Sequence, residues 1–164
     1  MPDEHDDADD LEHPPAFFPL ESADPLEGNS DLGEPVEVLV EGVFWAESSM
    51  GDSQRFVLLS NGDQKLPITI GMAEATAITT ALEGDQPDRP MTHDLLKVII
   101  DRVGGTVERV LIDDLWNGTY YAKLHIALNN EIQEIDCRPS DAIAAALRFE
   151  APVFVLEGIL KQSN

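Results

Sequence analysis

A predicted strand, a proline turn and a small-residue helix follow one another without a gap from Glu131 to Arg148, and this stretch constrains the fold most. Apolar and polar residues alternate over Glu131–Cys137, a pattern that predicts a half-buried strand. Pro139 ends that strand, because it has no N–H for the ladder and disfavours helix at the residue before it. Ser140 is a favourable N-cap, and the apolar stripe within Ala142–Leu147 predicts close packing of the helix against a sheet.

The rest of the chain predicts clustered strands with helices between them. This order favours an α+β fold over a doubly wound parallel sheet, and we expect a mixed, mostly antiparallel sheet with about three helices. Asn61 and Gly62 predict a tight hairpin turn, because both residues accept positive φ at low cost. The other predicted strands are Val36–Trp45, Arg55–Leu59, Leu66–Ile70, Thr106–Asp113, Thr119–Leu128 and Val153–Leu156.

Two more helices are predicted from apolar residues that recur at helical spacing. The first spans Ala73–Glu83, and its Ala77-Ile78 pair recurs 65 residues later as Ala142-Ile143, which predicts two related hairpin–strand–helix halves. Thr92 is expected to cap the second helix. The expected buried face of this second helix consists of Leu95, Leu96, Ile99, Ile100 and Val103.

Charge is distributed unevenly along the 164 residues. The formal net charge is −22, and residues 1–35 hold 12 of the 32 acidic side chains without any Lys or Arg. We expect a disordered acidic tail over residues 1–34, one folded domain over 35–160, and a frayed end that begins near Glu157 and includes 161–164. A charge of this size opposes long-range attraction to nucleic acid and to anionic membranes.

Cysteine content and hydropathy indicate a compartment. The single cysteine, Cys137, excludes an internal disulfide and fits a reducing environment. The chain has no apolar run long enough to cross a membrane, and its acidic start is unlike a signal peptide. We therefore expect a cytoplasmic protein without a membrane partner.

Acidic side chains lie at the predicted ends of several elements, whereas no strong catalytic motif is present. Convergence of Asp136, Asp141, Glu74 and Asp94 would create a site for Mg²⁺ or Mn²⁺, which prefer carboxylate oxygens. Such an ion would polarise a phosphodiester and activate water. The alternative interpretation for Asp94 and Asp141 is capping, because helix N-termini favour negative charge.

Three further polar residues lie beside these acids. Arg138, with Ser140 next to it, either binds a phosphate bidentately or forms an internal ion pair with Asp136 or Asp141. His93 either serves as a general base or makes only a local hydrogen bond at a helix start. The sequence leaves both alternatives open.

Four stretches carry a resemblance to a known family. They are, in chain order, Pro67–Ala75, Arg89–Leu95, Asp136–Ala144 and Pro152–Val155. With their surroundings, roughly residues 36–160, they resemble the bifunctional nuclease (BFN) domain family of bacteria and plants. The resemblance implies an α/β domain that self-associates and a nuclease that acts on DNA and RNA. It supplies no agreed catalytic set, so the candidate site residues are the polar members of the matching stretches.

Two functions follow as hypotheses. In the first, the protein is a metal-assisted phosphodiesterase that acts on single-stranded DNA or RNA. Asp136 and Asp141, with Glu74 or Asp94, then hold the metal, and His93 is the base. In the second, the protein is a non-catalytic, homo-oligomeric binding or regulatory module whose acidic tail recruits a partner.

Overall fold

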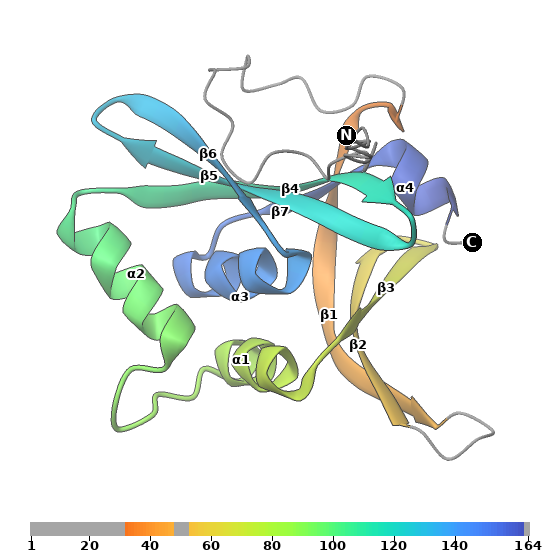
Figure 1. Ribbon diagram of the computed structural model, residues 1–164, viewed down its shortest axis with the longest axis horizontal. Coiled ribbons are helices and arrows are strands. Elements are labelled where there is room, and N and C mark those ends of the chain that lie inside the picture. The colour runs from red at the N-terminus through yellow and green to blue at the C-terminus, as the bar shows by residue number, and fades with distance from the viewer. Residues whose placement is uncertain (1–31, 48–52, 163–164) are drawn as a thin grey trace, which may run out of the picture.

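In the computed structural model, the described residues are 32–47 and 53–162. Most of the expected acidic tail lies outside them, and so does a turn that the sequence predicts over residues 48–52. Seven strands form one sheet in the order β3-β2-β1-β7-β4-β5-β6 (Figure 1). All neighbouring strands are antiparallel except β7 and β4. The strands are β1 (Pro35–Glu47), β2 (Ser53–Asn61), β3 (Gln64–Ile70), β4 (Thr106–Trp116), β5 (Thr119–Leu128), β6 (Glu131–Cys137) and β7 (Val153–Leu156). The helices are α1 (Met72–Glu83), α2 (Thr92–Arg102), α3 (Pro139–Phe149) and α4 (Glu157–Gln162).

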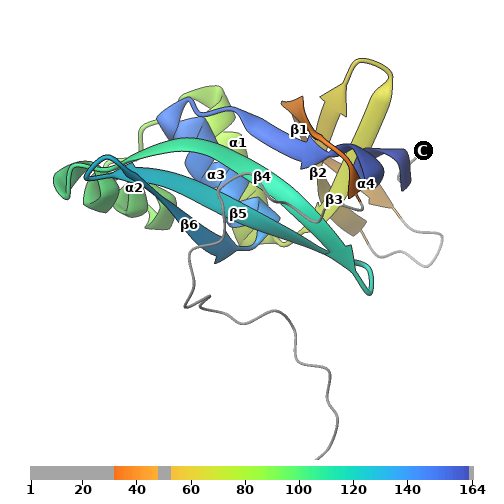
Figure 2. The ribbon, with the colours of Figure 1, turned by 90° about the horizontal axis from the view of Figure 1, so that it is seen from above.

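This architecture confirms the predicted α+β class with a mixed, mostly antiparallel sheet. The order of elements is the same in two parts of the chain, because three antiparallel strands precede a helix in both β1-β2-β3-α1 and β4-β5-β6-α3. Strand β7 joins the two parts, pairing with β1 on one side and β4 on the other. Seen from above, β4 and β5 run from the end of the molecule that carries α2 to the end that carries β1–β3 (Figure 2).

The core is centred on α3, which packs against α1, α2, β4 and β5 (Figure 1). Its alanines are buried together with Ile143. Small side chains let the helix axis approach the sheet closely, and the apolar area removed from water contributes roughly 25 cal/mol per Å² to stability. None of the helices in the described ranges has the length and apolar character needed to span a bilayer.

Two predicted helix caps lie at the wrong residue. Helix α3 begins at Pro139 with Arg138 as its N-cap, and Ser140 is the second helical residue. Proline suits the first helical position, because the N–H that it lacks has no partner there. Helix α2 begins at Thr92 itself, and its N-cap Met91 donates its main-chain N–H to the Asp94 carboxylate at 2.9 Å.

The predicted buried face of α2 is wrong for three of its five residues. Ile100 is buried and Leu96 is half-buried against the core, whereas Leu95, Ile99 and Val103 are 51%, 51% and 60% exposed. Apolar residues occur on both sides of this helix, and the side that packs against α3 and the core carries Ile100 and Leu96. The helix therefore presents an apolar stripe to solvent.

The expected frayed end is ordered up to Gln162. Residues Glu157–Gln162 form α4, and Ile159 and Leu160 are fully buried. Helix α4 therefore contributes to the core and packs against β3, β7 and β4. Residues 163 and 164 lie outside the described part.

Candidate functional site

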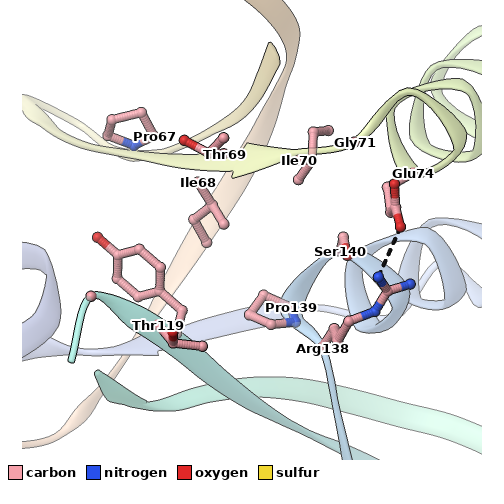
Figure 3. Close-up of a pocket in the computed structure, with 12 residues that line it drawn as sticks. Pro67, Ile68, Thr69, Ile70, Gly71, Glu74, Thr119, Arg138, Pro139 and Ser140 are labelled. Atoms are coloured by element: carbon pink, nitrogen blue, oxygen red, sulfur yellow. Dashed lines mark hydrogen bonds and ion pairs between the residues drawn. The ribbon is translucent and has the colours of Figure 1, made fainter. Parts of the chain in front are cut away.

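Three helices begin around the guanidinium of Arg138, which is the N-cap of α3. Its Nη1 donates to Glu74 Oε1 in the first turn of α1 at 2.8 Å, an interaction drawn in Figure 3. Its Nε and Nη2 donate to Asp141 Oδ2 and Oδ1 in the first turn of α3, at 2.7 and 3.2 Å. Charge-assisted, bidentate bonds of this kind fix the plane of the guanidinium. The structure thus shows Arg138 as the centre of an ion-pair network.

Asp141 extends the network to the first turn of α2. Its Oδ1 lies 3.0 Å from His93 Nε2. Burial alone would raise the pKa of Asp141, but the hydrogen bonds from Arg138 and His93 outweigh burial and lower it. The carboxylate therefore stays ionised and holds the imidazole by one nitrogen, which leaves Nδ1 available. The network Glu74–Arg138–Asp141–His93 is called the arginine network below.

Gly71 helps to place the outer member of the network. A Cβ added at Gly71 would lie 2.5 Å from Glu74 Oε2, so any side chain there would displace this carboxylate. The glycine that ends β3 therefore lets Glu74 turn back toward Arg138 within the first turn of α1. The sequence places Gly71 within the stretch Pro67–Ala75 that resembles the family but indicates no role for it in the site.

A cavity of about 490 Å³ lies beside the arginine network. Its walls come from the end of β3, the β4–β5 turn and the start of α3, so both halves of the fold contribute (Figure 3). Arg138, Glu74 and Ser140 form one polar end. The rest of the lining mixes apolar side chains such as Ile70 with side chains that carry hydroxyl groups, namely Thr69, Thr119 and Tyr120. His93 and Asp141 do not line it. His93 is therefore linked to Arg138 through Asp141 and lies outside the cavity lining.

Several hydrogen-bond donors at this polar end have no acceptor among the described residues. Arg138 uses three of its five N–H groups on carboxylates, and its side chain is 65% exposed. Within the described residues, neither the hydroxyl nor the main-chain N–H of Ser140 has a partner. The N-terminal end of α3 adds the positive end of the helix dipole. This arrangement is suited to one anionic group such as a phosphate.

Asp94 belongs to a second, separate cluster. Its Oδ1 accepts a 2.5 Å hydrogen bond from Arg148 Nε, and Arg148 Nη1 donates to the carbonyls of Ala77 and Ala144. The Arg148 side chain is only 7% exposed. Burial would raise the pKa of Asp94, but the bond from Arg148 and that from the Met91 N–H lower it. Arg148 thus ties α1, α2 and α3 together, and sequence reasoning missed it. Arg148 lies four residues after Ala144, on the same side of the predicted helix, and this spacing could have indicated that Arg148 is buried.

The structure does not bring Asp136 to the arginine network. Asp136 pairs with Lys123 across β5 and β6, and it has no hydrogen bond to the other predicted site residues in the described part of the chain. Burial raises its pKa, which Lys123 partly offsets. Cys137, the next residue, points its thiol to the Ala122 carbonyl, and burial raises its pKa to about 12. Successive strand residues face opposite sides of a sheet, so Asp136 lies away from the thiol.

The predicted metal ligands do not fit a divalent ion in this arrangement. The carboxylates of Glu74 and Asp141 are bound by Arg138, and that of Asp94 is bound by Arg148. An arginine among the ligands would repel a cation. Within residues 32–47 and 53–162, no three side chains of His, Cys, Asp or Glu gather closely enough to hold a metal.

Comparisons with known proteins identify relatives over most of the folded part. The model of the family described as bifunctional nuclease domain matches residues 57–164. An uncharacterized protein of Mycobacterium tuberculosis is 43% identical over 105 residues, which are 64% of this chain and 62% of that protein. Bifunctional nuclease 1 of Oryza sativa subsp. indica is 32% identical over 96 residues, which are 57% of this chain and 29% of that protein. Bifunctional nuclease 2 of Arabidopsis thaliana is 28% identical over 93 residues, which are 55% of this chain and 28% of that protein. The match thus spans less than two thirds of the length of each of these relatives.

Proposed function

Because this chain belongs to the bifunctional nuclease domain family, we propose that it hydrolyses phosphodiester bonds of single-stranded DNA and RNA at the arginine network. The observation that carries the proposal is Arg138, which is fixed by two carboxylates yet keeps unused N–H groups at the polar end of a cavity. Sequence relatives named as bifunctional nucleases support the class of reaction.

In the proposed reaction, Arg138 and Ser140 bind the phosphodiester. The two free N–H groups of the guanidinium, together with the hydroxyl and the main-chain N–H of Ser140, donate to the nonbridging oxygens. The next two N–H groups of α3, those of Asp141 and Ala142, already donate to the Arg138 carbonyl. These donors oppose the negative charge that develops on the phosphoryl oxygens in the transition state, which is where preorganised donors contribute most to rate. Glu74 and Asp141 prevent the guanidinium from rotating away.

His93 is the proposed acid–base group. Asp141 holds the ring through Nε2, so Nδ1 takes a proton from the attacking water and Asp141 stabilises the imidazolium that forms. Attack of the water oxygen on phosphorus breaks the bond to the leaving sugar oxygen, which takes a proton from solvent, and the imidazolium then returns its proton to solvent. Because His93 does not line the cavity, the scissile phosphate must lie across the exposed side chain of Arg138. A single strand reaches both sides of that arginine, with one nucleotide on the cavity side and the next toward α2. The proposed mechanism assigns no residue to a metal ion.

Overall charge limits how the substrate is held. The net charge of −22 repels a polyanion, and Glu74 and Asp141 add negative charge next to Arg138. The proposal therefore relies on one local phosphate contact rather than on a basic surface. Affinity for a long strand is then expected to exceed that for a dinucleotide only slightly.

The test is cleavage of a labelled single-stranded oligonucleotide by Asp141→Asn and Asp136→Asn variants of the full chain. We expect Asp141→Asn to lower the cleavage rate at least 100-fold, because the variant loses the negative charge that orients His93 and Arg138. A loss of at least this size is typical when one group of a catalytic unit is removed. Asp136→Asn should cleave at the wild-type rate. Asp88→Asn, in an exposed loop, is the matched control.

Mg²⁺, Mn²⁺ and EDTA lanes accompany each protein, with every variant purified in the same way and checked by circular dichroism. Equal cleavage by wild type and Asp141→Asn would contradict the proposed site. Loss of cleavage in Asp136→Asn alone, with dependence on a divalent ion, would instead place a metal site on the β5–β6 face.

The apolar stripe on α2 supports a second candidate function, that of a self-associating binding module. Leu95, Ile99 and Val103 follow one another at four-residue spacing and are all half exposed or more. Two antiparallel copies of α2 that meet at Ile99 would place Leu95 against Val103 of the second copy. An isologous contact of this kind is the commonest way for soluble proteins to dimerise. An uncharged stripe is also where two strongly acidic chains repel each other least.

The variant Ile99→Glu tests this second candidate. A charge at the centre of the stripe should convert the oligomer to a monomer, because burying an unpaired carboxylate costs several kcal/mol. Light scattering coupled to gel filtration measures the change. Leu39→Glu, the same kind of change at a 70% exposed position of β1, is the control. A wild type that is monomeric at every concentration would contradict the candidate.

A further inference from the structure

The cavity beside Arg138 has the size and lining of a binding site for a small aromatic group. Its volume of about 490 Å³ falls within the ~300–1,000 Å³ typical of pockets for small ligands. Charged groups are confined to the end formed by Arg138 and Glu74, next to Ser140. Ile68, Ile70 and Pro139 contribute apolar surface to the wall, and Thr69 and Thr119 contribute hydroxyl groups to it (Figure 3). Tyr120 adds an aromatic ring with a hydroxyl. A ligand that suits this lining combines one anionic group with a part that has apolar faces and polar edges.

The edge of the sheet provides hydrogen-bonding groups along one wall. Strand β3 is the last strand of the sheet, and its residues from Pro67 to Ile70 line the cavity. An edge strand has main-chain N–H and C=O groups that no neighbouring strand uses. Such groups can pair with the donor and acceptor atoms on the edge of a planar ring. Pro67 removes one N–H from this edge, which makes addition of a whole peptide strand less favourable.

Charge at the polar end restricts the anion. Arg138 contributes one positive charge, whereas Glu74 and Asp141 contribute two negative charges next to it. The Arg138 pKa is raised by its bonds to Asp141 and then Glu74, so the guanidinium remains charged. A singly charged phosphodiester is accommodated by the two free N–H groups, but each further negative charge would meet the two carboxylates. The site therefore favours a phosphodiester over a di- or triphosphate.

From these features we propose that the cavity binds one unpaired nucleobase of a single-stranded nucleic acid, with the adjoining phosphodiester on Arg138. This inference rests on the proposed function and specifies its substrate. The base enters between β3 and the β4–β5 turn and stacks on Tyr120, and stacking of a base on an aromatic side chain is tolerant of sequence. A base that is paired in a duplex cannot enter, so the cavity selects single strands.

Binding of a phosphorothioate-linked dithymidine dinucleotide to the full chain tests the inference, measured by isothermal titration calorimetry. The probe carries one charge and resists cleavage. Thr69→Trp and Thr119→Trp each add an indole to an exposed position on the cavity wall without changing the arginine network. We expect either variant to weaken binding at least 10-fold. Thr106→Trp, the same change at an exposed position of β4 away from the cavity, should bind like wild type.

Two further probes separate the base from the phosphate. Inorganic phosphate and thymidine triphosphate should each bind at least 10-fold more weakly than the dinucleotide. Equal binding by inorganic phosphate and by the dinucleotide would overturn the inference, and so would unchanged dinucleotide binding in both tryptophan variants.

Oligonucleotide cleavage by the same variants distinguishes this inference from the proposed function. If both tryptophan variants cleave at the wild-type rate, the nuclease proposal stands and the base site is wrong. If the dinucleotide binds in the cavity but no protein cleaves, the base site stands and the nuclease proposal is wrong.

Discussion

Replacing Arg138 by alanine is expected to lower the rate of single-strand cleavage by about 10²–10³-fold, the loss typical of removing one preorganised donor to a developing anion. Arg138 is the one cation in the arginine network that faces the cavity, and its three bonds to Glu74 and Asp141 fix its position. Without it, two carboxylates face the phosphodiester directly. Cleavage of a labelled oligonucleotide under single-turnover conditions measures the loss.

Stability should change little in this variant, because exposed ion pairs contribute about 0–1 kcal/mol. Arg138→Lys keeps the charge but loses the planar fork, so it should recover less than a tenth of the wild-type rate. Arg89→Ala removes the same charge from an exposed loop position and is the control. A wild-type rate in Arg138→Ala would show that this arginine is only a structural ion pair.

Replacing Arg148 by alanine is expected to destabilise the folded chain by about 3 kcal/mol, at the lower end of the range for breaking a buried ion pair. The change leaves the Asp94 carboxylate without its cation and the carbonyls of Ala77 and Ala144 without their donor. It also removes the side chain that ties α1 and α2 to α3. Thermal unfolding should shift downward by roughly 10 °C for a domain of this size.

The dependence of this loss on pH identifies its cause. The pKa of Asp94 is lowered in the folded state, so the pair stabilises the fold above the unfolded pKa of about 4 and loses its effect as pH falls through the folded value. The difference in unfolding free energy between wild type and variant should therefore be full at pH 7 and smaller near pH 3. Arg102→Ala, at the exposed end of α2, is the control. A difference that stays constant with pH would attribute the loss to packing alone.

Sequence patterns were sufficient for most of the backbone. The alternation in Glu131–Cys137 and the Asn61-Gly62 turn each predict an element that the structure contains. These signals are local, because a strand or turn depends on residues within a few positions. The repeated Ala-Ile pair at 77 and 142 likewise marks two helices that follow the same order of strands.

The same patterns did not predict which side chains are buried where burial depends on the neighbouring elements that cover a helix. Helical spacing shows that Leu95, Ile99 and Val103 share one side of α2, but it does not show which side faces α3. The burial of Ile159 and Leu160 was not predicted for a different reason: a six-residue helix is too short to show helical periodicity in the sequence.

The same distinction between local and long-range information applies to the candidate site. The sequence by itself identified the family, the fold class and the polar residues at the starts of the helices, because motifs and caps are local in the chain. Only the tertiary structure brought Glu74 and His93, which are 64 and 48 residues away from their partners, to Arg138 and Asp141. It also separated Asp136 from Asp141, although they are five residues apart, because a strand side chain and a helix N-terminus project in different directions. Long-range packing therefore decided which charges meet.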